Sequence, residues 1–71
     1  MNMTEVASII KRRRKVLGVD QASVAELADV STHTLSNIES GKGNPTLESL
    51  SRVLDVLGLE LAIQPKTNEP G

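Results

Sequence analysis

The sequence predicts an all-α domain of about four helices, followed by one short strand. Apolar residues recur at helical spacing in four successive segments, and each segment follows a polar residue that can cap a helix. After Gly58 the pattern changes to alternation of apolar and polar residues, which is typical of a half-buried strand. The 71 residues suffice for one domain, and the absence of aromatic residues requires an aliphatic core.

The first helix is expected to begin at Thr4 and to end near Leu17. Thr4 is a suitable N-cap, and Glu5 follows in the first turn, where a carboxylate interacts favourably with the helix dipole. Gly18 is well placed to end this helix. We expect residues 1–3 to be disordered.

Two short helices joined by a tight turn are expected next. Asp20 can cap the first of them, which runs to about Ala28, and Ser31 can cap the second, which Gly41 ends. Asp29 then occupies the turn between them. This arrangement gives the middle of the chain two amphipathic helices of about two turns each.

A fourth helix is expected from the cap at Thr46 to Gly58, so that residues 4–58 form one domain. Residues 59–64 form the predicted strand, and its backbone groups need a partner. The simplest partner is the same strand of a second subunit, paired antiparallel across a two-fold axis. Pro65 stops the ladder, and residues 65–71 are expected to be a flexible tail.

The alternation assigns the apolar side of this strand to a dimer interface formed by Leu59, Leu61 and Ile63. The alternative is an extended arm that packs on its own domain.

Composition restricts the class of protein. The chain lacks cysteine, which excludes disulfides and thiolate metal sites, and no apolar run approaches the length of a membrane span. We find no paired carboxylates, no nucleophile next to a base, and no glycine loop for phosphate. The sequence therefore predicts a cytoplasmic protein that is not an enzyme and holds no metal or cofactor.

Charge is unevenly distributed along the chain. The formal net charge is −1, which argues mildly against binding to nucleic acid. Five of the eight basic residues nevertheless lie in residues 11–15, and such a local stripe can hold phosphates.

The second short helix has a polar face that no local apolar pattern explains. Its side chains are small and can form hydrogen bonds, as a helix that reads the DNA major groove requires. The alternative is an ordinary solvated surface. The candidates for base readout, all opposite Leu35 and Ile38, are Thr32, His33, Ser36 and Asn37.

Several motifs in register resemble the Cro/C1-type (XRE) helix-turn-helix family over residues from about 10 to 57. They are AELA at 25–28, VS at 30–31, TLSNIE at 34–39 and GKGNPT at 41–46. The resemblance implies a lambda-repressor-like fold and a dimeric repressor bound to a palindromic operator in double-stranded DNA.

Within the family, TLSNIE, PTLESL at 45–50 and LGLELAI at 57–63 are most similar to HipB-type proteins. This narrower resemblance implies an antitoxin that represses its own operon and binds a HipA-like kinase toxin. A stand-alone repressor without a toxin remains an alternative. So does a protein-interaction module that does not bind DNA.

The resemblance also implies roles for single residues. An ion pair between Arg14 and Glu39 would join the first and third helices, and Asp29 stands where the family usually has glycine, in a left-handed conformation. DNA phosphate contacts are implied for Gln21, which opens the first helix of the motif, and for Thr34, Lys42, Gly43 and Asn44.

Overall fold

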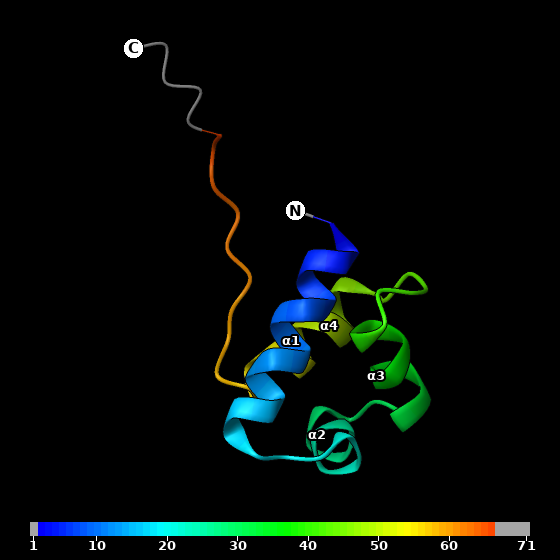
Figure 1. Cartoon of the computed structure of the whole chain (residues 1–71). Helices are drawn as coiled ribbons and strands as arrows, with labels where there is room; N and C mark the ends of the chain where they lie inside the picture. The colour runs from blue at the N-terminus through cyan, green and yellow to red at the C-terminus, as the bar shows by residue number, and fades with distance from the viewer. Residues whose placement is uncertain (1, 67–71) are drawn as a thin grey trace.

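The computed structural model describes residues 2–66 and consists of four helices and an extended C-terminal segment (Figure 1). This confirms the predicted all-α domain of four helices. The helices are α1 (Met3–Leu17), α2 (Gln21–Ala28), α3 (Thr32–Glu39) and α4 (Leu47–Val56). None of the four is long and apolar enough to cross a membrane.

The start of α1 differs from the prediction. Asn2 is the N-cap, because its side-chain oxygen accepts a hydrogen bond from the amide of Glu5 at 2.9 Å. The predicted cap at Thr4 is therefore wrong. Asn2 and Met3, which were expected to be disordered, form the cap and the first helical residue, and Met3 packs against the core.

The other three helices begin at the predicted caps. Asp20, Ser31 and Thr46 each accept a hydrogen bond from the amide three residues further on, at 2.7–3.0 Å. Each cap satisfies one backbone donor that the first turn of a helix leaves without a partner. The local sequence thus sets where α2, α3 and α4 begin.

An aliphatic core joins the four helices. In Figure 1, α2 lies at one end of α1 and α3 lies beside α1, and α2 packs against both α3 and α4. The buried core side chains are at most 8% exposed: Val6, Ile10, Val24, Ala25, Ala28, Leu35, Ile38, Leu50, Val53, Leu54 and Leu57.

One residue of the basic run holds the end of α4. The Arg13 guanidinium donates through Nε to the backbone carbonyl of Leu57 at 2.9 Å, although 44 residues separate the two. A cation at this end of a helix also interacts favourably with its dipole. Arg13 therefore stabilises the fold by joining α1 to the end of α4, and the sequence did not predict this contact.

The C-terminal segment follows α4 and then extends away from the helices (Figure 1). Leu59 is half-buried against the core and its amide donates to the carbonyl of Leu54 at 2.8 Å. Beyond it the chain is exposed, and Ile63 is 92% exposed. Residues 59–64 form no strand within the single chain, since a ladder requires a second backbone. Of the predicted tail, residues 67–71 lie outside the described part.

Candidate nucleic-acid interface

Helix α3 presents the predicted polar face to the outside. Leu35 and Ile38 are buried on its inner side, at 0% and 1% exposure, and this fixes the rotation of the helix about its axis. Because positions three and four residues apart share a helix face, the opposite side brings the four candidate base readers together. Three of them are exposed and the fourth is half-buried: Thr32, His33, Ser36 and Asn37.

Two of these side chains contact each other. The amide nitrogen of Asn37 lies 3.3 Å from Nε2 of His33, one helical turn earlier. The pair lies on the exposed surface of α3. It is the single hydrogen bond between the four candidate base readers in residues 2–66.

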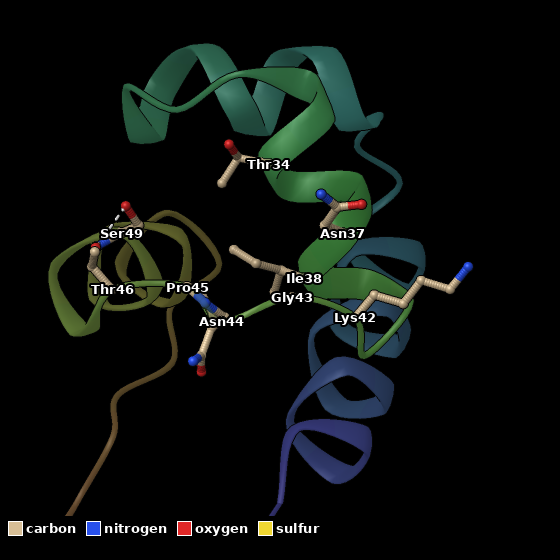
Figure 2. Close-up of a pocket in the computed structure, with 9 residues that line it drawn as sticks. All are labelled: Thr34, Asn37, Ile38, Lys42, Gly43, Asn44, Pro45, Thr46 and Ser49. Atoms are coloured by element: carbon tan, nitrogen blue, oxygen red, sulfur yellow. Dashed lines mark hydrogen bonds between the residues drawn. The ribbon is translucent and has the colours of Figure 1, made fainter.

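The loop between α3 and α4 forms the wall of a surface cavity of about 290 Å³ next to this face. In Figure 2, Thr34 and Asn37 reach it from α3, while Thr46 and Ser49 reach it from the start of α4. The loop contributes Lys42, Gly43 and Asn44, so four of the five predicted phosphate contacts gather here.

The loop has little freedom to move away from α3. The amide of Lys42 donates to the carbonyl of Asn37 at 3.0 Å, and the Ser40 hydroxyl donates to the same oxygen at 3.0 Å. Gly41 and Gly43 have φ values of 75° and 76°, in the left-handed region that favours glycine. Glycine at these positions allows the tight return of the chain.

Thr46 and Ser49 complete the cavity and were not among the predicted site residues. The Thr46 hydroxyl donates to Ser49 Oγ at 3.0 Å, besides capping α4. The capping signal at Thr46 located these residues at a helix start. They lie opposite α3 because the loop between α3 and α4 turns the chain back, and the sequence pattern did not predict this turn.

Gln21, the fifth predicted phosphate contact, lies apart from this cavity. It is the first residue of α2, half-buried, and its side-chain nitrogen donates to Glu39 Oε1 at 3.1 Å. The side chain therefore already binds α3. One amide hydrogen and the side-chain oxygen have no hydrogen-bond partner within residues 2–66.

The Glu39 carboxylate lies at the centre of a buried cluster. Arg14 Nε contacts Oε2 at 2.6 Å and Arg14 Nη2 contacts Oε1 at 3.0 Å, so the pair is bidentate. The Glu39 side chain is only 3% exposed and that of Arg14 is 14% exposed. Arg14 also donates to the carbonyl of Val19 at 2.9 Å. The cluster links α1, the α1–α2 turn, α2 and the end of α3.

The cluster determines the ionisation of its members. Burial alone would raise the pKa of Glu39, but the hydrogen bonds from Arg14 and Gln21 outweigh it and hold the pKa below its ordinary value. The hydrogen bond to Glu39 raises the pKa of Arg14. Glu39 therefore remains a carboxylate at neutral pH and keeps α3 attached to α1.

Between residues 2 and 66, no three His, Cys, Asp or Glu side chains gather closely enough to hold a metal ion. The same residues contain no buried side-chain nitrogen or oxygen without a hydrogen-bond partner.

Comparison with known proteins identifies the family to which the chain belongs. A family model described as Helix-turn-helix matches residues 10–64. An uncharacterised HTH-type transcriptional regulator of Haemophilus influenzae is 38% identical over 52 residues, which are 73% of this chain and 53% of that protein. The chain thus spans about half the length of this curated relative.

Three solved structures share the fold at 26% sequence identity. A chain in the HipA-HipB-O2-O3 complex has a TM-score of 0.82, with 92% of each chain covered, and a structure described as MDT Protein gives the same values. A variant of the restriction-modification controller protein C.Esp1396I has a TM-score of 0.75, with 82% of this chain and 75% of that chain covered. The family match includes α2, α3 and the turn between them, and the chain belongs to the helix-turn-helix family of the Cro/C1 (XRE) type.

Proposed function

We propose that the chain is a sequence-specific DNA-binding transcriptional repressor that inserts α3 into the major groove. The observation that carries this proposal is the outward face of α3. Its exposed side chains are of the types that bind base edges, and its inner side is fixed by buried Leu35 and Ile38. The membership in the helix-turn-helix family supports the same assignment.

In this proposal, the residues around the cavity beside α3 contact the phosphate backbone of the DNA. Lys42 is exposed at the rim of this cavity and brings a positive charge next to α3. Contacts to phosphate fix the register of a protein on the duplex but carry no sequence information directly. Thr34, Gly43 and Asn44 would add hydrogen bonds from the same side. Gln21 would bind a second phosphate with the amide hydrogen that Glu39 does not use.

A dimer formed through residues 59–64 completes the proposal. Leu61 is 37% exposed and Ile63 is 92% exposed in the single chain, on a segment whose backbone has no ladder partner there. Antiparallel pairing with the same segment of a second copy would satisfy these backbone groups and cover the apolar side chains. A dimer places two recognition helices about one DNA turn apart, which corresponds to a palindromic operator.

The test replaces the polar face while the fold is kept. We expect the double variant Ser36→Ala with Asn37→Ala to lose at least about tenfold in affinity for its operator, since each lost base contact is worth ~1–3 kcal/mol. Ser51→Ala, an exposed serine on α4, is the matched control and should bind as the parent does. Fluorescence anisotropy gives the affinity, and analytical ultracentrifugation checks that the variant is still dimeric.

Unchanged DNA affinity in a folded double variant would contradict the proposal. It would favour the rival assignment, a protein-interaction module that uses this fold without binding DNA. The net charge of −1 is the observation in favour of that rival.

A narrower function is an antitoxin that represses its own operon. The likeness to a chain of the HipA-HipB-O2-O3 complex, at a TM-score of 0.82, supports this version. It requires a HipA-like kinase toxin as a second partner. If a gene for such a kinase adjoins this one, co-expression should yield a stable complex of the two proteins. Absence of such a gene would favour a stand-alone repressor.

A further inference from the structure

The contact between His33 and Asn37 determines which atoms of the asparagine face outward. An amide nitrogen can only donate, so the 3.3 Å approach of Asn37 Nδ2 to His33 Nε2 makes Nε2 the acceptor. The histidine thereby fixes one of the two orientations of the Asn37 amide, which otherwise differ only by a rotation of its terminal group.

The backbone of Asn37 is also held in place. Its carbonyl accepts hydrogen bonds from the Lys42 amide and the Ser40 hydroxyl, both at 3.0 Å. The loop passes so closely that a Cβ at Gly43 would lie 3.9 Å from Cβ of Asn37. Because the residue is half-buried here, it has less freedom than the exposed side chains earlier in α3.

An acceptor and a donor of Asn37 remain available. Within residues 2–66, neither Oδ1 nor the second hydrogen on Nδ2 forms a hydrogen bond. Side by side, these two atoms match the major-groove edge of adenine, which offers the N6 amino group as donor and N7 as acceptor. Adenine is the only base that presents both a donor and an acceptor on its major-groove edge.

Building on the proposed function, we propose that Asn37 reads an adenine in each half-site and that His33 is the positioning residue that orients the Asn37 amide. His33 then affects specificity at the base pair that Asn37 contacts. A direct contact between His33 and DNA would instead affect a different base pair.

Selection of random duplex DNA followed by sequencing tests this, with four variants compared to the parent. Asn37→Ala should remove the preference for adenine at one position of each half-site, a preference of roughly five- to 150-fold for a good bidentate contact. His33→Leu, which has no acceptor, should reduce the same preference at the same position at least about threefold. His33→Gln should retain most of it, since a glutamine oxygen one turn away can accept from the asparagine amide.

The double variant His33→Leu with Asn37→Ala separates positioning from direct contact. If His33 acts through Asn37, the double variant has the same base preference at this position as Asn37→Ala alone. An unchanged adenine preference in His33→Leu, or a change confined to another base pair, would overturn the proposal. If the parent protein enriches no sequence at all, it is the proposed function that fails.

Discussion

At the scale of single residues, Asp29 has an unusual backbone conformation. Its φ of 57° and ψ of 44° place it in the left-handed region, and it is the only residue other than glycine with a positive φ within residues 2–66. A side chain with a Cβ is strained there. The family that the sequence resembles usually has glycine at this turn position, which predicted a left-handed conformation, and the structure confirms it.

We expect Asp29→Gly to raise the free energy of unfolding by ~0.5–1 kcal/mol, because glycine adopts this conformation without steric cost. The Asp29 carboxylate lies 4.0 Å from Arg52, but it is 94% exposed, so that its loss costs little. Urea unfolding measures the change. Asp29→Ala is the control and should not stabilise the protein. If Asp29→Gly were less stable than the parent, the backbone at this position would not be strained.

Lys42 is expected to bind a phosphate without reading a base. Lys42→Gln should weaken binding to specific and unrelated DNA alike, and reduce the slope of log affinity against log salt by about 1. Affinities measured at four or more salt concentrations give the slope, and Lys66→Gln is the control. A slope equal to that of the parent would remove Lys42 from the interface.

At the scale of elements, the sequence predicted the helices through signals that act over a few residues. The caps at Asp20, Ser31 and Thr46 depend only on the amide three residues away, and each was predicted correctly. At the first helix the cap was predicted at Thr4 and lies at Asn2, because apolar spacing does not locate a helix start to within two residues. The cap formed at Asn2 because this adds Met3 to the helix and to the core.

Contacts between distant elements could not be predicted from local patterns. The hydrogen bond from Gln21 to Glu39 joins residues 18 apart, and that from Arg13 to Leu57 joins residues 44 apart. The Arg14–Glu39 pair was predicted from the family resemblance, since nothing in the spacing of the two residues specifies it. The outward face of α3 could be predicted from the sequence, because the apolar residues Leu35 and Ile38 mark the opposite, buried side of the helix.

The ion pair between α1 and α3 is expected to be essential for stability. Glu39→Ala should lower the free energy of unfolding by ~3–5 kcal/mol, because Arg14 would be left partly buried without its partner. Replacing both residues by apolar ones, Arg14→Met with Glu39→Leu, should cost less than Glu39→Ala alone. Urea unfolding of the three proteins decides this. A cost below about 1 kcal/mol for Glu39→Ala would contradict the structural role.

The same carboxylate predicts a loss of stability in acid. The folded protein holds the pKa of Glu39 below its ordinary value, and a backbone hydrogen bond from Ser23 lowers that of Asp20. Each group therefore adds stability above its unfolded pKa, near 4, and this stability is lost as the pH falls through that value to the folded pKa. We expect unfolding free energies measured from pH 7 to pH 3 to decrease below about pH 5, and Glu39→Gln to show a smaller decrease. Equal slopes for both proteins would contradict the assignment to Glu39.

At the scale of the whole molecule, the family model covers residues 10–64 and therefore extends past α4 into the exposed segment. Alternation in the sequence predicted a strand there. The single chain forms no strand within residues 2–66, because strand pairing in a dimer is a property of two chains. The association of subunits therefore needs its own measurement.

We expect Ile63→Lys to weaken dimerisation, because a charge would replace an apolar side chain that is 92% exposed until a second copy covers it. The variant should shift toward the monomer in analytical ultracentrifugation and lose affinity for a two-half-site operator. Gln64→Lys is the control, since its side chain lies on the other side of an extended segment. A dimer of unchanged stability in Ile63→Lys would exclude this segment as the interface.

Whether α3 reads DNA is decided by a selection of random duplex DNA on the purified protein, followed by sequencing of the retained molecules. The proposed function predicts an enriched inverted repeat whose half-sites are about one helical turn apart. No enriched sequence at low salt, from a protein shown to be folded and dimeric, would contradict it and would assign the exposed face of α3 to a protein partner.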